Sequence, residues 1–252
     1  MLESLPLEAI ATAAFLAFCR IGACFMIMPG LSSARVPLQV RLFVAIAATW
    51  ALLAHLWDAI LPFTDRRPDN LLLLVASELL VGGLMGLVAR LYMLALEFIG
   101  SVIAMNIGYG GMLGSSIEDN EPQSALGAII SFSALLLLFV LDFHHQIVRA
   151  LVSSYQAIPI EALFDPRGSL VDVTDTLRES FYIMMRLGSP FVAYAILVNL
   201  ATGFVNKLTP QIPVYFISLP FVIAGGLTLL YFGITTFLSL AMDGFIPTTI
   251  GR

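Results

Sequence analysis

The sequence predicts an all-α protein that lies in a membrane, on the basis of its composition, the length of its apolar stretches and its short loops. Of its 252 residues, 59% are hydrophobic and only 12% are charged, and the mean hydropathy is +0.95. Soluble domains carry about 25% charged residues, so water is not the main solvent of this surface. Helices that span a bilayer need about 20 residues. Most of the apolar stretches reach that length: Ala9–Met28, Val40–Leu61, Leu71–Leu96, Leu96–Gly114, Ser124–Leu141, Ser180–Val205 and Ile212–Met242.

The first stretch is predicted to be a retained helix rather than a signal peptide. Acidic Glu3 and Glu8 precede it instead of positive charge, and Arg20 lies inside it. Cys19 and Cys24 have neither zinc-knuckle nor disulfide-framework spacing and are expected to be buried. The formal net charge is −5 and no basic run occurs, so nucleic acid is not an expected partner.

Polar segments divide the chain into parts of one helical domain, residues 1–252. An N-terminal helical block is expected over 1–160, followed by a polar connector at 161–179. A broken helical hairpin is expected over 180–252, because Pro210, Pro213 and Pro220 each remove a backbone donor and break or kink a helix.

Several charges lie within or at the ends of apolar stretches and need partners. A charge at the centre of a bilayer costs at least ~2.5–3.5 kcal/mol, so it normally faces protein or water. Two readings stay open: pairing with a neighbouring subunit, or extension of the side chain to the interface at helix ends. These charges are Arg20, Glu78, Arg90, Glu97, Arg186 and Lys207.

Small residues at four-residue spacing predict close helix contacts. Gly82 and Gly86 form a GxxxG pattern, and Gly100, Ala104 and Gly108 repeat the step. Such spacing lets helix backbones approach, since lipid gives no hydrophobic drive for association.

A polar stretch after the fifth apolar segment invites a catalytic or metal-binding interpretation, which the spacing does not favour. On one helix Asp142, His145 and Arg149 share a face, whereas His144 points about 100° away from His145. A zinc site needs three or four ligands, and the sequence contains no HExxH pattern. It also contains no GxSxG nucleophile elbow, and Asp142 has no evident second acid. We therefore expect no enzyme activity, metal or cofactor, and a polar helix end buried against other protein.

A glycine-rich segment predicts irregular backbone in the middle of the chain. Each glycine costs a helix about 1 kcal/mol relative to alanine. Irregular backbone at membrane depth is tolerated where it is buried in protein or lines an aqueous cavity. A flexible apolar stopper in a pore and a plain loop are both open. The segment is Gly108, Tyr109, Gly110, Gly111, Met112, Leu113 and Gly114.

Taken together, these segments resemble the FliR family of flagellar export-gate proteins and their injectisome relatives. Near the start are Arg20, Pro29, Pro37 and Arg41, and at the end NKLTPQ runs into VYFISLPFVIAGGL. Between them, GYGGMLGSSIEDNEPQ is followed by an apolar helix and HHQIVRALVSSYQAIP. The chain departs from the family at Asn120-Glu121-Pro122, where an Asp-Pro pair is frequent, and at Pro213, where asparagine is frequent.

The resemblance implies a non-enzymatic subunit of kinked helical hairpins, wound around a channel in the bacterial inner membrane within the flagellar basal body. It implies FliP-like and FliQ-like partners, FlhB-like and FlhA-like components, surrounding lipid, and unfolded flagellar subunits as cargo. It also implies that the glycine-rich loop plugs the closed channel, with Met112 and Leu113 nearest the axis.

Residues assigned by this resemblance to inter-subunit packing or charge pairing are Arg20, Glu78, Arg90, Glu97, Asp142, His144, His145, Arg149, Lys207, Pro210 and Gln211. The chief alternative is a stand-alone secondary transporter whose path Glu78, Arg90 and Asp142 would line. An injectisome subunit is a further alternative, and an intramembrane hydrolase a more distant one.

Overall fold

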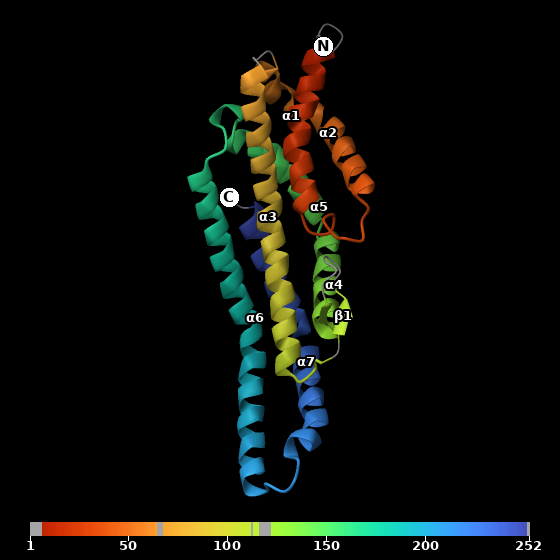
Figure 1. Ribbon diagram of the computed structural model, residues 1–252, viewed down its shortest axis with the longest axis vertical. Helices are drawn as coiled ribbons and strands as arrows, with labels where there is room; N and C mark the ends of the chain where they lie inside the picture. Colours follow the sequence, from red (N-terminus) through yellow and green to blue (C-terminus); the bar gives the residue numbers. More distant parts are fainter. Residues whose placement is uncertain (1–6, 65–67, 112, 116–121, 251–252) are drawn as a thin grey trace.

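The computed structural model describes residues 7–64, 68–111, 113–115 and 122–250, which form an elongated helical bundle (Figure 1). The all-α class predicted from composition and apolar spacing is confirmed, with one short β-ladder added to it. The α-helices are α1 Leu7–Ile27, α2 Leu38–Ile60, α3 Pro68–Asn106, α4 Ala125–Val140, α5 Phe143–Ala157, α6 Pro166–Leu208 and α7 Val214–Ile250. Short 3₁₀ turns, η2 Leu61–Phe63 and η3 Ile160–Ala162, follow α2 and α5.

Five of these helices, α1, α2, α3, α6 and α7, are long and apolar enough to cross a membrane. The α4–α5 pair is a sixth candidate, but its two halves meet at an angle of 65°. The chain is therefore a membrane protein with five long spanning helices and one strongly bent helix pair.

The boundary predicted near Leu96 is wrong, because α3 runs unbroken through it to Asn106. Gly100 is the single weak helix former between Leu96 and Asn106, and it lies against α4, where an added Cβ would be 3.2 Å from Gly127 Cα. Close packing at this point offsets the propensity cost of about 1 kcal/mol.

Helix α3 ends in a Schellman motif at Gly108. This glycine has a φ of 78°, and the amide of Tyr109 donates to the carbonyl of Ala104 at 2.8 Å. A second bond joins the amide of Gly108 to the carbonyl of Met105. The left-handed conformation suits glycine, which explains why the helix stops there.

Most of the segment expected as a polar connector, 161–179, is helical. Asp165 caps α6, because its carboxylate accepts from the amides of Arg167 and Gly168, and Pro166 occupies the first turn. Proline at that position and an acidic N-cap both favour helix initiation. Residues 166–179 are therefore the first turns of α6.

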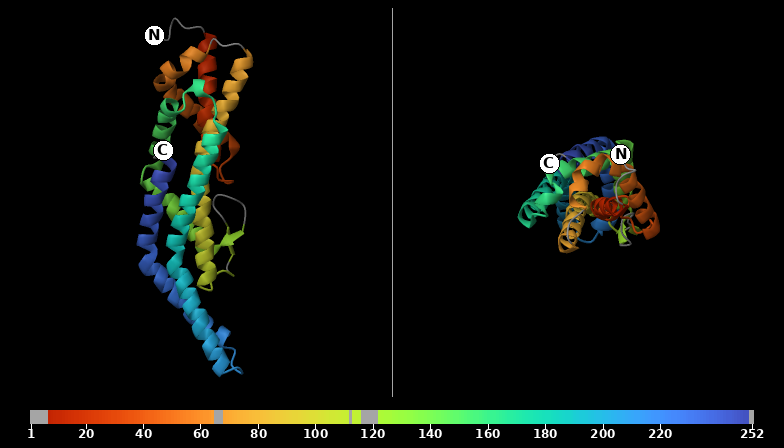
Figure 2. Two further views of the ribbon diagram at one scale, coloured as in Figure 1. Left: turned by 90° about the vertical axis from the view of Figure 1, so that its left-hand side faces the viewer. Right: turned by 90° about the horizontal axis from the view of Figure 1, so that it is seen from above.

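Helices α6 and α7 form an antiparallel hairpin whose turn, residues 209–213, contains Pro210 and Pro213. Pro190 lies inside α6 and Pro220 inside α7, and each lacks the amide proton that a straight helix requires. Figure 2 shows the hairpin bending away from the rest of the bundle toward its tip.

The core forms where α1 packs on α3, with α2 on the other side of α1 and α6 against α3. The GxxxG prediction is confirmed, and its partner is α1. A Cβ on Gly82 would lie 2.0 Å from the carbonyl oxygen of Arg20, and one on Gly86 would lie 2.7 Å from that of Cys24. These contacts are with backbone, which cannot move aside as a flexible side chain can.

Gly82→Ala is expected to push α1 away from α3 and to lower the free energy of unfolding by about 1–3 kcal/mol or more, as overpacking does. Gly83→Ala is the matched control, because its Cβ would meet only Ile27 Cδ1, at an ordinary 3.6 Å. Thermal unfolding of the purified variants in mild detergent measures both. Equal melting temperatures for the two variants would contradict the close α1–α3 contact.

Candidate functional site

The glycine-rich segment leaves the end of α3 and returns to the start of α4 through a two-stranded ladder. Strand β1, Leu113–Ser115, pairs antiparallel with β2, Pro122–Ser124, and Leu113 lies opposite Ser124. Ser124 then caps α4, its hydroxyl accepting from the amide of Gly127 at 3.0 Å. The ladder lies on the flank of the bundle beside α4 (Figures 1 and 2).

Of the predicted plug segment Gly108–Gly114, all but one residue lie within the described residues. Met112 lies outside them, as do residues 116–121. Gly108 terminates α3, Tyr109 packs partly buried against the core, and an added Cβ on Gly111 would meet no atom within 4 Å. The ladder holds the two ends of this loop together at a fixed place on the bundle.

A buried ionic cluster connects three helices at the N-terminal end of the bundle. Arg20 on α1 and Glu78 on α3 form a bidentate pair, with Nε–Oε2 at 2.7 Å and Nη2–Oε1 at 2.6 Å. Both side chains are 1% exposed. Bidentate pairs of this kind are among the stronger charge-assisted hydrogen bonds.

The segment around α5 completes the coordination of Arg20. Its Nη1 donates to the hydroxyl of Ser154 at 3.0 Å, and its Nη2 donates to the carbonyl of Ile158 at 3.1 Å. The guanidinium carbon lies 3.9 Å from the ring centroid of Tyr155, a cation–π contact. The cluster therefore fixes α1, α3 and α5 relative to one another.

This arrangement corrects the expectation that neighbouring subunits supply the partners of Arg20 and Glu78. They are satisfied within one chain, because close packing at Gly82 brings α1 next to α3. The contributions of Ser154, Tyr155 and Ile158 were missed by the sequence analysis. A usable signal existed, since an arginine and a glutamate inside two apolar stretches each require an opposite charge.

The remaining charged and polar positions lie nearer the surface of the single chain. Arg90 and Glu97 are partly buried on α3. Other predicted contact residues are exposed on α5 and at the α6–α7 turn: Asp142, His144, His145, Arg149, Lys207, Pro210 and Gln211. The structure leaves this second group accessible to a neighbouring protein.

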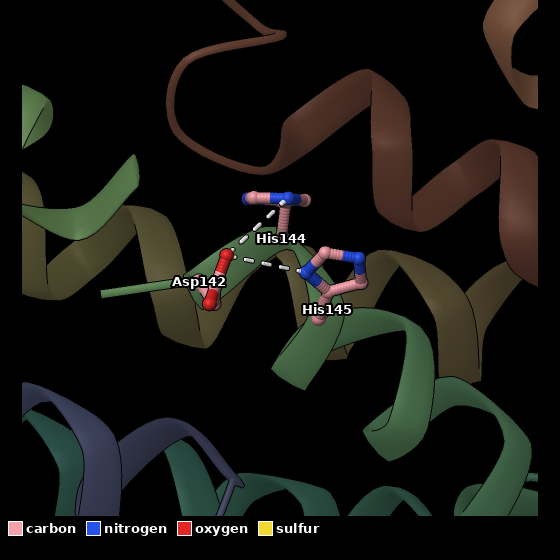
Figure 3. Close-up of side chains that lie close together, drawn as sticks. All are labelled: Asp142, His144 and His145. Carbon is pink, nitrogen blue, oxygen red and sulfur yellow. Dashed lines mark ion pairs between the residues drawn. The ribbon is translucent and has the colours of Figure 1, made fainter. Parts of the chain in front are cut away.

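Asp142, His144 and His145 are brought together, which a straight helix would prevent (Figure 3). Asp142 precedes α5 in a left-handed conformation, with a φ of 56°, at the bend between α4 and α5. Its Oδ1 lies 3.4 Å from His145 Nδ1 and 3.9 Å from His144 Nε2. Asp142 therefore precedes α5 rather than lying within it, and its carboxylate still reaches His145, three residues on.

A cavity of about 110 Å³ lies between the end of α3 and the α6–α7 hairpin. Polar groups on its wall come from Asn106, Asn199, Thr202, Tyr215 and Ser218. A second, more open cavity of about 270 Å³ lies nearer the hairpin tip, along Asn206 and Phe216. Neither wall contains a carboxylate, an imidazole or a thiol, and Tyr215 lines both cavities.

The sequence profile of the family described as "Bacterial export proteins, family 1" matches residues 11–246. The chain belongs to this family. Among relatives of this chain, the flagellar biosynthetic protein FliR of Caulobacter vibrioides is 29% identical over 231 residues, which cover 89% of this chain and 91% of that protein. The FliR of Bacillus subtilis is 27% identical, covering 83% and 81%, and that of Escherichia coli is 24% identical, covering 84% and 80%. The FliR-family resemblance seen in the sequence is confirmed.

Breaking the buried pair in this export protein is expected to cost about 3–5 kcal/mol, because the remaining charge is left uncompensated. Arg20→Met or Glu78→Leu alone should therefore strongly lower the melting temperature in detergent. The double variant should recover much of the loss, because no unpaired charge remains. Arg178→Met, at an exposed arginine on α6, controls for loss of a cation at the surface. Additive losses in the double variant would show that the two residues do not interact.

Proposed function

We propose that this chain is a structural, channel-forming subunit of the flagellar type III protein export gate in the bacterial inner membrane. In this role it helps unfolded flagellar subunits to cross the membrane and helps to seal the closed pore. Membership in the bacterial export family and extensive matches to flagellar FliR proteins support this assignment.

The observation that carries the proposal is the length over which α6 exposes large apolar side chains. They extend from Leu170 to Leu208, which is about 57 Å at 1.5 Å per residue. The exposed large apolar residues of α6 are Leu170, Val171, Leu177, Phe181, Tyr182, Met185, Val192, Ile196, Leu197, Leu200, Phe204, Val205 and Leu208.

A bilayer cannot cover that whole length. Its hydrocarbon core is about 30 Å thick, and even a steep tilt of about 40° leaves roughly 44 Å of α6 along the bilayer normal. Charged side chains, among them exposed Asp172 and Arg178, alternate with the apolar ones in the first turns of α6. Large exposed apolar side chains that lipid does not cover are a mark of a protein–protein interface. The α6–α7 hairpin is therefore assigned to contacts with other gate subunits.

FliP-like and FliQ-like subunits are the proposed partners of this surface, with FlhB-like and FlhA-like components around the assembled gate. Residues 1–160 serve as the packed helical block, and the hairpin of 180–252 as the part that joins the assembly. The exposed charges Arg149 and Lys207, with Pro210 and Gln211 at the hairpin turn, are proposed contacts in this assembly. Arg90 and Glu97 are assigned the same role from α3.

The stand-alone transporter is the less favoured function. It would use Glu78, Arg90 and Asp142 along a substrate path, but the Glu78 carboxylate already accepts hydrogen bonds from Nε and Nη2 of Arg20. None of the three residues lines the cavities of about 110 and 270 Å³. We therefore assign this chain a role in assembling the gate, without enzyme activity or a cofactor.

The loop between α3 and α4, residues 108–122, is proposed to seal the closed channel. Its described ends, Leu113–Ser115 and Pro122–Ser124, are held together by the β1–β2 ladder beside α4. Met112 and Leu113 are assigned to the position nearest the channel axis. Apolar side chains at a constriction exclude water and ions, as hydrophobic gates do.

Co-expression with FliP-like and FliQ-like subunits tests the assembly. The three should co-purify in mild detergent, whereas this chain alone should aggregate. Phe204→Lys, at a 61% exposed position on α6, should reduce recovery of the complex about tenfold or more, as loss of an interface anchor does. Thr209→Lys adds the same charge to the polar turn and should have little effect. A monodisperse, solute-transporting monomer would refute the proposal.

Deletion of Gly110–Ser116 tests the seal in the assembled complex. Small-ion conductance of the closed gate should rise in planar bilayers or vesicles, since the deletion removes both apolar side chains assigned to the constriction. Gly111→Ala is the control and should stay closed, because a Cβ there meets open space. Unchanged conductance after the deletion would remove the loop from the sealing role while leaving the assembly role intact.

A further inference from the structure

The bend between α4 and α5 gathers three metal-ligating side chains. One ligand atom from each of Asp142, His144 and His145 lies within 4.8 Å of the other two. Figure 3 shows both imidazoles beside the Asp142 carboxylate. The two rings are also adjacent, with centroids 4.2 Å apart.

The local backbone creates this arrangement. Asp142 adopts a left-handed conformation that aspartate tolerates better than most residues, and α5 begins directly after it. The two histidines therefore lie in the first turn of a new helix rather than on a continuation of α4. Adjacent residues of a helix point about 100° apart, which applies to His144 and His145 within α5. Asp142 lies before α5, so its carboxylate can reach both imidazoles.

The carboxylate of Asp142 is not used to cap the helix. An N-terminal aspartate ordinarily accepts from the amides at the second or third helical position. Here no side-chain capping bond forms, and the first turn is closed by the Asp142 carbonyl, which accepts from the amides of His145 and Gln146. The carboxylate is therefore directed toward the imidazoles and free of a competing backbone role.

The distances fit an ion of the size and geometry of zinc. With bonds of about 2.1 Å, tetrahedral ligands lie about 3.4 Å from each other. Asp142 Oδ1 is 3.4 Å from His145 Nδ1 and 3.9 Å from His144 Nε2, and all three ligand atoms lie within 4.8 Å of one another.

We propose that Asp142, His144 and His145 bind one borderline divalent transition-metal ion, with Zn²⁺ as the reference ion, at the α4–α5 bend. Two imidazoles with one carboxylate suit zinc, cobalt or nickel, whereas Ca²⁺ and Mg²⁺ prefer oxygen ligands alone. All three residues are exposed, which leaves a fourth coordination position for water. The bound ion joins the residue before α5 to its first turn and so stabilises the bend.

The site can be tested on the full chain, purified in mild detergent with a tag that contains no histidine. After treatment with chelator and dialysis, the wild-type chain should bind one equivalent of Zn²⁺ by calorimetry. Loss of an outer-shell partner costs metal sites about 10–100-fold in affinity, so loss of a direct ligand should cost at least tenfold. Asp142→Asn, which keeps the shape and backbone tolerance of the residue, and His145→Ala should both show this loss.

His55→Ala is the matched control, because His55 is an exposed histidine on α2 and should leave the affinity unchanged. Zn²⁺ should also raise the melting temperature of the wild-type chain but not of Asp142→Asn, since a ligand bound only to the folded state stabilises it. Co²⁺ should give intense tetrahedral absorption bands in the wild-type chain alone.

Absence of stoichiometric binding, or binding that Asp142→Asn and His145→Ala leave intact, would overturn the site and establish a metal-free Asp–His cluster. The outcome is independent of gate assembly, because neither the metal titration nor the melting experiment requires the partner subunits.

Discussion

Arginine and glutamate side chains that are about 1% exposed in an apolar bundle persist only where each satisfies the other. Arg20 meets this condition by distributing its hydrogen bonds over Glu78, Ser154 and the carbonyl of Ile158. The arrangement requires α1 and α3 to be nearly in backbone contact, which Gly82 permits one helical turn after Glu78. Glycine spacing and ionic pairing therefore depend on each other. The glycines set the separation of α1 and α3, and the Arg20 hydrogen bonds fix α5 against these two helices.

The spanning helices differ in how much of their surface is buried within the chain. Half of the spanning window of α1 is buried within the chain, compared with 22% for α6 and 11% for α7. The windows of α2 and α3 are intermediate, at 28% and 33%, so the hairpin is the least covered of the spanning helices although α6 packs on α3. Lipid can cover only part of such long helices, which supports the proposed contacts of the hairpin with other subunits. The division between a self-packed block and an unsatisfied hairpin is what a subunit added to a larger assembly requires.

The sequence predicted the all-α class, most helix positions, the close approach at Gly82 and Gly86, and the interruption at Gly108. These features are local, because they depend on apolar length, the missing Cβ of glycine and the left-handed conformation that ends a helix. It misplaced a boundary at Leu96, where packing against α4 outweighs the weakness of Gly100, and it assigned Glu78 to neighbouring subunits. The Arg20–Glu78 pair joins residues 58 positions apart, and its geometry depends on how α1 and α3 pack. The Asp142 cluster was missed for another reason, since a single left-handed residue changes which side chains can meet.

Helices α4 and α5, joined at this bend, connect the glycine-rich loop to the core. Helix α4 begins at the Ser124 cap that closes the ladder, and α5 ends beside Arg20 through Ser154. At 16 and 15 residues, the two helices are about 24 and 22 Å long, each too short to cross the hydrocarbon alone. The bend lies between these two anchors, and its Asp142, His144 and His145 side chains are exposed, whereas those of the ionic cluster are buried. Because breaking a buried ion pair is strongly destabilising, the ionic cluster is the firmer attachment of α5 to the bundle.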